Sequence, residues 1–265
     1  MNIPFVKAHG ARNDFLLTWR HQLPAGLTDI AAASVAICDR HTGAGADGWM
    51  LVSKSTDGKA NGAIELWNSD GSRSEISGNG TRCAAALLVS QNLAGNDVHI
   101  ATGAGLKYLR LLESKGNEFL FEMNMGRAAI EELHATVEGR DAVILNVGNP
   151  QCAIFSDNFD FPWQQVGAVV ERLPRFPNRT NVSFIRVVDR HTLDVRFFER
   201  GAGETMSSGT GSTGAAAAAF ARGLVESPVT VLTPAGPLQL RWEADDILLA
   251  GPAELVVSGE FFYGA

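Results

Sequence analysis

Short apolar runs bounded by Gly, Asn and Asp recur along the chain, a pattern typical of β-strands joined by turns. In the first half this pattern predicts strands over residues 3–8, 49–53, 64–67, 98–102, 106–112 and 119–123. In the second half it predicts strands over residues 142–146, 153–155, 182–188, 193–198, 229–233 and 238–242. The chain is therefore expected to be rich in sheet.

Two alanine-rich segments, residues 81–93 and 214–222, break this pattern because they are apolar nearly all round. Such a composition is expected of a helix that is buried on every side rather than one that lies on a surface. Each half of the chain is thus predicted to be a sheet wrapped about one helix.

The two halves are related by an internal repeat. Ser77-Gly78-Asn79-Gly80 and Ser208-Gly209-Thr210-Gly211 lie 131 residues apart (208 − 77), and this offset holds without a gap from about residue 63 to residue 105. The period is too long for a solenoid, whose units run to roughly 20–50 residues. We expect an α/β (α+β) fold of two pseudo-symmetric domains, 1–120 and 121–253, each a curved, mostly antiparallel sheet or barrel around one central buried helix.

Composition narrows the class of partner. The 265 residues are 45% hydrophobic, enough for two cores, and the net charge of −7 with scattered Lys and Arg argues against nucleic acid. The sequence contains no run of about 18 or more apolar residues, the length needed to span a membrane. Three cysteines, an odd number with no metal-binding spacing, fit reduced thiols in a cytoplasmic protein. A small molecule is the expected partner, with no metal.

The repeated loops suggest a binding chemistry. A Gly-X-Gly turn that opens a helix leaves backbone N–H groups unpaired and pointing one way, which favours an anion such as a carboxylate. The structural alternative is that the glycines only permit tight turns, and that Ser77 and Ser208 only cap the helices. For either serine taken alone, the cap is the better interpretation.

Several motifs, in this order, give the chain its resemblance to a known family. They are HGARNDF at 9–15, DRHTGAGADG at 39–48, NSDGS at 68–72, GNGTRC at 78–83, GNP at 148–150, TNV at 180–182 and ERGAGET at 199–205. Over nearly its whole length the chain resembles the diaminopimelate epimerases, cofactor-independent isomerases of lysine and cell-wall precursor synthesis. The resemblance implies two domains with the C-terminal strand, 254–265, returning to the first.

The resemblance also implies a two-base reaction at an α-carbon, by which LL-diaminopimelate would become the meso form. In this family one cysteine thiolate removes the α-proton and a second cysteine thiol protonates the opposite face. Those positions fall on Ser77 and Ser208 here, so serine stands where a titrating thiol is expected. Cys83 is no substitute, because it lies six residues into the helix. A serine base needs a second group to take its proton; Glu75, Glu204 and His41 are candidates.

The same resemblance implies that the chain retains residues that bind a zwitterionic amino acid. They are Asn68, Asn181 and Arg200 for the distal end, Glu199 for the ammonium, Asn13, Asn79 and Asn149 around the reacting centre, and Gly78, Gly209 and Thr210 in the repeated loops. Arg grips a carboxylate with two parallel hydrogen bonds, and Asn both donates and accepts. Gln151 stands where the family usually has His. A homodimer is one assembly that we consider.

Other interpretations stay open. The same fold could serve an isomerase or dehydratase that uses a single carboxylate, Lys or His base, or a protein that binds an amino acid without catalysis. Departures that flank the serines, at Glu75, Ile76, Ser207, Ser212 and Thr213, favour natural divergence over a deliberate replacement of two cysteines.

Overall fold

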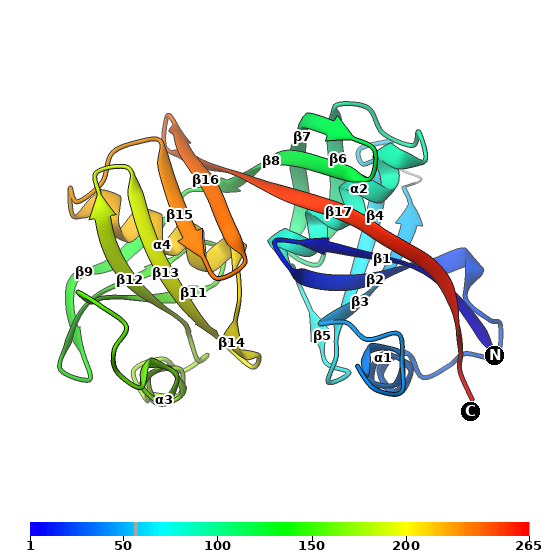
Figure 1. The fold of residues 1–265 in the computed structure, drawn as a ribbon, viewed down its shortest axis with the longest axis horizontal. Coiled ribbons are helices and arrows are strands. Elements are labelled where there is room, and N and C mark those ends of the chain that lie inside the picture. The colour runs from blue at the N-terminus through cyan, green and yellow to red at the C-terminus, as the bar shows by residue number, and fades with distance from the viewer. Residues whose placement is uncertain (56–57, 265) are drawn as a thin grey trace. The chain divides into compact units, whose positions relative to one another are not determined.

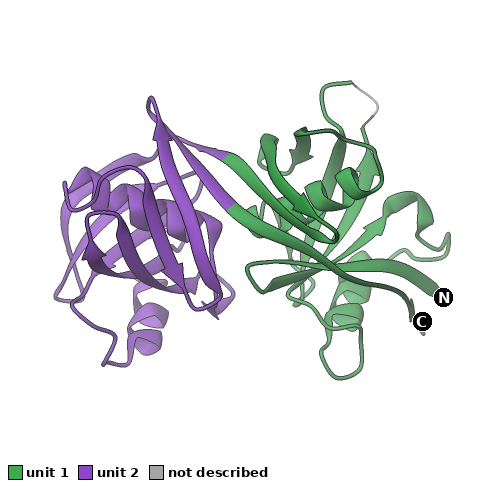
Figure 2. Ribbon diagram, turned by 45° about the horizontal axis from the view of Figure 1, so that its top comes forward, with its two compact units in different colours: residues 1–123, 251–265 green, residues 124–250 purple. Residues whose placement is uncertain are grey.

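A computed structural model describes residues 1–55 and 58–264, and the fold follows in two parts. Unit 1 contains Met1–Met123 and Gly251–Ala265, and unit 2 contains Asn124–Ala250 (Figure 2). The division falls inside two long strands, β8 (Glu118–Gly126) and β17 (Asp246–Phe262), each of which therefore contributes to both units. The last strand of the chain ends in unit 1, paired with the first strand.

Unit 1 is an eight-stranded barrel (Figure 1). Each strand pairs with the next, and β17 closes the ring by pairing with both β8 and β1. The pairs β2–β3 and β4–β6 are parallel, whereas β1–β2, β3–β4, β6–β7, β7–β8 and β1–β17 are antiparallel. The other members are β1 (Asn2–Gly10), β2 (Asn13–Trp19), β3 (Gly48–Lys54), β4 (Gly62–Asn68), β6 (Asp97–Thr102) and β7 (Gly105–Lys115); β5 (Arg73–Ser74) pairs with β4 alone.

Helix α2 (Gly78–Ser90) is the core of unit 1 and contacts β1, β2, β4 and β6. Its residues from Gly78 to Leu88 are buried, as expected for a helix that is apolar all round. Helix α1 (Ile30–Cys38) packs on β3 and β4, and begins where the Asp29 carboxylate accepts the Ala32 N–H. A short 3₁₀ helix, η1 (Arg20–Gln22), follows β2.

Unit 2 repeats this plan, with a sheet that runs from β9 to β17 around the central helix α4 (Gly209–Ala221). Helix α3 (Trp163–Val170) packs on strands of this sheet, and its Trp163 ring meets Phe184 at a centroid distance of 5.8 Å. The strands are β9 (Ala129–Val137), β10 (Arg140–Asn146), β11 (Pro150–Phe155), β12 (Asn181–Asp189), β13 (Thr192–Glu199), β15 (Val229–Thr233), β16 (Gly236–Glu243) and the start of β17, with β14 (Gly203–Thr205) on β13.

The predicted fold class, with one buried helix in each half, is confirmed. Both helices begin earlier than predicted, at Gly78 and Gly209 instead of residues 81 and 214, because the preceding serines cap them. The pattern missed β2, whose residues from Phe15 to Trp19 are all buried and so show no alternation of polar and apolar positions. No helix in the described part of the chain is long and apolar enough to cross a membrane.

Candidate functional site

The two repeated serines have the same local geometry. Ser77 (φ −132°, ψ 123°) and Ser208 (φ −135°, ψ 123°) are both N-caps. The Gly80 N–H donates to Ser77 Oγ over 3.1 Å, and the Gly211 N–H donates to Ser208 Oγ over 3.0 Å. Each serine oxygen therefore satisfies one of the unpaired donors at the start of its helix. The cap explains the shared backbone geometry, and the difference between the serines lies in their other contacts.

In the ranges that the structure describes, Ser208 is the one of the two serines whose hydroxyl is hydrogen-bonded to a carboxylate. Its hydroxyl donates to Glu199 Oε1 over 2.6 Å, while its oxygen accepts the Gly211 N–H. Ser208 is only 3% exposed, so this charge-assisted bond lies in a region of low dielectric. Among the residues that the structure describes in unit 1, no carboxylate is hydrogen-bonded to Ser77 Oγ. The sequence had suggested Glu199 for a substrate ammonium, and its contact with Ser208 was missed.

The turn after Glu199 is held by two side chains from other segments, Asn181 and Glu171. Asn181 Oδ1 accepts the Arg200 backbone N–H over 3.0 Å, and Asn181 Nδ2 donates to Pro150 O over 3.0 Å. The Glu171 carboxylate, whose side chain is 3% exposed, accepts the Gly201 N–H over 2.8 Å and pairs with Arg179. Arg200 is itself exposed, and one of its guanidinium nitrogens donates to the backbone of Asn178. The predicted binding residues Glu199 and Arg200 thus lie at one turn, and Asn181 of β12 is hydrogen-bonded to it.

Asn149 is a further predicted residue, and it contacts the start of α4. Gln151 Nε2 donates to Asn149 Oδ1 over 2.7 Å, and Asn149 Nδ2 donates to Thr210 Oγ1 over 3.3 Å. Gln151 is 1% exposed, and its Oε1 has no hydrogen-bond partner in the described part of the chain. The amide at this position therefore orients Asn149, a role that needs no titrating ring.

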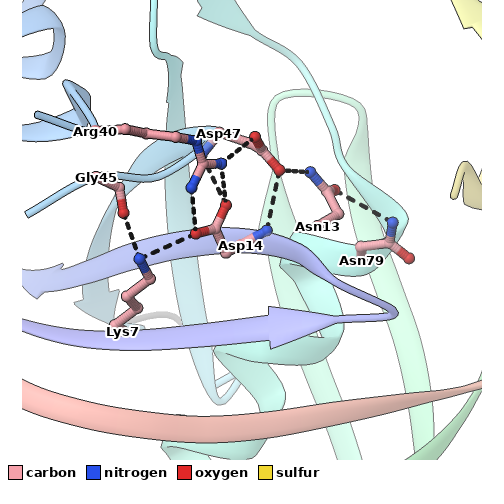
Figure 3. Close-up of polar contacts among 7 residues, drawn as sticks. All are labelled: Lys7, Asn13, Asp14, Arg40, Gly45, Asp47 and Asn79. Carbon is pink, nitrogen blue, oxygen red and sulfur yellow. Dashed lines mark hydrogen bonds and ion pairs between the residues drawn. The ribbon is translucent and has the colours of Figure 1, made fainter. Parts of the chain in front are cut away.

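In unit 1 a continuous line of side chains joins the start of α2 to the β1–β2 hairpin (Figure 3). Asn79 Nδ2 donates to Asn13 Oδ1 over 3.2 Å, and Asn13 Nδ2 donates to Asp47 Oδ2 over 2.7 Å. At the other end, the Arg82 guanidinium donates to Asn79 Oδ1 over 2.5 Å. The structure thus brings the predicted residues Asn13 and Asn79 together. It adds Arg82 and Asp47, which lie in the quoted motifs but had no predicted role.

Asp14 anchors the hairpin beside this line. The Arg40 guanidinium grips its two oxygens over 3.1 and 2.7 Å, and Lys7 Nζ lies 3.1 Å from it (Figure 3). Burial alone would raise the pKa of Asp14, but the hydrogen bonds from Arg40 and Lys7 outweigh this, and its pKa lies below the ordinary value. Arg40 also binds Asp47 over 2.7 Å. These charges fix the hairpin that carries Asn13.

The remaining predicted residues have other hydrogen-bond partners or lie in exposed loops. Asn68, at the end of β4, donates to Ser72 Oγ over 2.9 Å. His41 and Glu75 are exposed loop residues of unit 1, and Glu204 on β14 accepts a long hydrogen bond of 3.4 Å from Gln164. In the described ranges, none of His41, Glu75 and Glu204 is hydrogen-bonded to the serine of its own unit. Their suggested role as auxiliary bases stays a prediction.

The three thiols are buried away from such chemistry. Burial raises the pKa of Cys38 to about 11, that of Cys83 to about 12 and that of Cys152 to about 12, so each is protonated at neutral pH. Cys83 lies inside α2, as the sequence predicted. Over residues 1–55 and 58–264, no group of three or more His, Cys, Asp or Glu side chains could hold a metal ion.

Comparison with known proteins assigns the family. The family model for diaminopimelate epimerase matches residues 5–131 and 143–256. The chain belongs to the diaminopimelate epimerase family. Diaminopimelate epimerase of Pelotomaculum thermopropionicum is 36% identical over 98% of this chain and 99% of the relative. That of Moorella thermoacetica is 37% identical over 97% of this chain and 98% of the relative. The resemblance stated from the motifs is therefore confirmed, and the family is one of isomerases.

Solved structures share the fold at low identity. A phenazine biosynthesis protein of the PhzF family from Bacillus anthracis has a TM-score of 0.76 and 15% identity, covering 99% of this chain and 100% of that one. A hydroxyproline epimerase from Agrobacterium vitis has a TM-score of 0.69 and 14% identity, covering 98% and 92%. The fold of the diaminopimelate epimerase family thus extends to proteins with other names, and the fold alone does not choose a substrate.

Proposed function

We propose that this chain epimerises an amino acid at its α-carbon, converting LL-diaminopimelate to the meso form, with Ser77 and Ser208 at the two proton-transfer positions. The observation that carries the proposal is the 2.6 Å hydrogen bond from Ser208 to the Glu199 carboxylate. A serine hydroxyl becomes basic only when an adjacent group takes its proton. Glu199 is placed to be that group, and family membership supplies the reaction type.

The proton route on the Ser208 side follows from this contact. As Ser208 Oγ takes the α-proton, its own proton passes along the existing hydrogen bond to Glu199 Oε1. The Gly211 N–H, which already donates to Ser208 Oγ, stabilises the negative charge that develops on the oxygen. Glu199 then carries the former hydroxyl proton of Ser208, and Ser208 is again a neutral hydroxyl that carries the proton taken from the substrate.

In this proposal Ser77 protonates the opposite face of the α-carbon. Its hydroxyl hydrogen is free of the cap, because the cap uses the oxygen as an acceptor for the Gly80 N–H. Donation of that hydrogen to the carbanion leaves an oxyanion at the N-terminus of α2, where unpaired N–H groups favour negative charge. Water must then reprotonate Ser77. Among the described residues no carboxylate assists this serine, so we expect its step to limit the rate.

The substrate assignment rests on the retained binding residues. We propose that Arg200, Asn181 and Asn68 bind the distal amino-carboxylate end of diaminopimelate. This assignment is supported by the name of the relatives and by the hydrogen bond from the Arg200 backbone N–H to Asn181, which fixes the turn. Gly78, Asn79, Gly209 and Thr210 would bind the reacting end through N–H and hydroxyl donors at the two helix starts.

The proposed reaction is tested with purified protein and LL-diaminopimelate in heavy water. We expect meso product that carries deuterium at the inverted α-carbon, while recovered LL substrate at early times keeps its hydrogen, because different groups act on the two faces. Absence of both product and exchange at high protein concentration would refute epimerisation. Calorimetric binding without exchange would identify a binding protein instead.

Exchange without inversion supports a second candidate, an isomerase with a single base. This candidate is favoured by the difference between the two serines, because Ser208 has a carboxylate partner and Ser77 has only its cap among the described residues. In that case Ser77→Ala would leave exchange of the α-hydrogen intact, whereas Glu199→Gln would abolish it. Under the two-base proposal both variants lose inversion.

Restoring the thiols gives a further test of the two positions. Ser77→Cys with Ser208→Cys introduces groups whose ordinary pKa is near 8.5 and is lowered at a helix N-terminus. We expect the double variant to epimerise at least about 100-fold faster, since general acid–base catalysis contributes roughly 10²–10⁴-fold when the pKa suits the pH. An equal or lower rate in a folded double variant would mean that these positions do not transfer the protons.

A further inference from the structure

A buried amide on β11 is connected to the start of α4 through one other side chain. Gln151 is 1% exposed, and its Nε2 donates to Asn149 Oδ1 over 2.7 Å. Asn149 Nδ2 in turn donates over 3.3 Å to Oγ1 of Thr210, the second residue of α4. All three residues belong to unit 2, so the connection is made within one compact part of the chain.

Helix α4 makes room for the Gln151 side chain. A Cβ atom at Gly214 would lie 3.1 Å from Gln151 Cγ and 3.3 Å from Gln151 Cβ, which is closer than side chains normally pack. The repeat places Gly214 at the position of Cys83 (83 + 131), which is buried inside α2, a helix of the same length. A central helix of this fold therefore accepts a side chain there. Glycine is unfavourable inside a helix, and the close approach of Gln151 explains its presence at 214.

The hydrogen bonds from Gln151 to Asn149 and on to Thr210 run in one direction. Since Asn149 Nδ2 is the donor, Thr210 Oγ1 is used as an acceptor and its own hydrogen takes no part. Among the described residues, no acceptor takes the Thr210 hydroxyl hydrogen. Thr213, three residues further along α4, instead donates its hydroxyl to the Gly209 carbonyl over 2.8 Å. The threonine at the helix start thus keeps a donor that its neighbour spends on the backbone.

We propose that Gln151 is a positioning residue: by directing Asn149 Nδ2 onto Thr210 Oγ1, it leaves the Thr210 hydroxyl to donate to the α-carboxylate of the substrate. This rests on the proposed function, which places Thr210 at the reacting end of the amino acid. The N-terminal end of a helix also favours negative charge at this point. Because an amide does not titrate, the direction set by Gln151 is the same at every pH used to assay the protein.

The test is a double-mutant cycle of Gln151→Met and Thr210→Val, with Kd for LL-diaminopimelate from calorimetry and KM and kcat from turnover. Thr210→Val should raise Kd and KM at least about tenfold, as expected for the loss of a hydrogen bond to a charged group. Gln151→Met should raise both in the same direction. The double variant should bind no more weakly than Thr210→Val alone, because both changes remove the same donor. Additive losses would overturn the proposal, and so would wild-type Kd and KM in folded Gln151→Met.

A matched control is the same change at a second glutamine that is hydrogen-bonded to a threonine. Gln239 is exposed on β16, and its Oε1 accepts the Thr230 hydroxyl over 3.2 Å. Gln239→Met should leave Kd and KM unchanged. Equal losses of affinity in Gln239→Met and Gln151→Met would overturn the positioning role.

Side-chain amide NMR of the free protein keeps the proposal falsifiable if Gln151→Met does not fold. Thr210→Val removes the acceptor of Asn149 Nδ2, so the Asn149 side-chain amide proton should move upfield. If the hydrogen bonds ran the other way, Asn149 Nδ2 would donate to Gln151 and this proton would not move. An unmoved proton would therefore overturn the proposal.

The same measurement separates this proposal from the proposed function. If the wild type neither binds nor exchanges diaminopimelate, the proposed function fails. An upfield shift of the Asn149 proton in Thr210→Val would still support the placement of a free Thr210 hydroxyl by Gln151.

Discussion

Within the described part of the chain, replacing Ser208 by alanine removes two side-chain hydrogen bonds, whereas the same replacement at Ser77 removes one. Both variants lose the cap on a glycine N–H three residues ahead, at nearly the same length of 3.1 and 3.0 Å. Only Ser208→Ala also removes a hydrogen bond to a carboxylate, at 2.6 Å. Since the two caps share their backbone angles, Ser77→Ala is a matched control for Ser208→Ala.

The expected losses differ by more than the scatter of such measurements. A cap contributes about 1 kcal/mol, and a hydrogen bond to a charged group adds about 1.5–3 kcal/mol. We therefore expect the start of α2 to lose about 1 kcal/mol in Ser77→Ala and the start of α4 to lose about 3 kcal/mol in Ser208→Ala. The difference of about 2 kcal/mol corresponds to roughly 30-fold in the opening equilibrium.

Native-state hydrogen exchange measures each helix start separately, which matters because a chain of two units need not unfold in one step. The reporters are the Thr81 and Ser212 amides, which donate to the Ser77 and Ser208 carbonyl oxygens over 2.8 and 2.9 Å and keep these partners in the alanine variants. Equal acceleration of the two reporters would refute the reasoning. Glu199→Gln should couple to Ser208→Ala by about 1 kcal/mol, whereas Glu204→Gln should be additive with it.

Three further predictions concern groups outside the proton-transfer positions. Glu171→Gln should destabilise unit 2 by about 2 kcal/mol in chemical denaturation, because it leaves Arg179 without its buried partner. Glu132→Gln, which removes the exposed ion pair between Glu132 and Arg175, should lower the stability by under about 1 kcal/mol. Equal losses in Glu171→Gln and Glu132→Gln would contradict this. The lowered pKa of Asp14 means that its ionised form stabilises the fold above pH about 4 and that this stability is lost as the pH falls through the folded pKa. Asp14→Asn should therefore flatten the dependence of thermal stability on pH below about pH 4, and an unchanged loss of stability in acid would count against the Arg40 and Lys7 contacts. A thiol reagent at pH 8 should label Cys38, Cys83 and Cys152 far more slowly in the native protein than in the unfolded chain. Fast labelling of any of the three in the native protein would show that this thiol lacks the burial that raises its pKa.

Local sequence patterns predicted those elements whose composition is set by their own burial. The central helices were predictable because an element buried on every side must be apolar on every side, and the repeat marked the serines at their starts. Buried strand β2 was not predictable in this way, because full burial removes the alternation that identifies a strand. The hydrogen bonds from Arg82 to Asn79 and from Asn79 to Asn13 were not predictable from local patterns either, because Asn13 lies 66 residues before Asn79.

The sequence by itself determined the family, the fold class and the positions of the two serines, because motif order and internal repetition are properties of the chain alone. Only the tertiary structure decided which serine has a proton acceptor. Glu199 and Ser208 are nine residues apart, and the chain must fold back after β13 before these two side chains meet. The contact therefore follows neither a helical nor a strand spacing in the sequence. A hydrogen bond depends on tenths of an ångström and on direction, and these are set by packing rather than by sequence order. The two serines that look alike in the sequence are therefore chemically unequal in the fold.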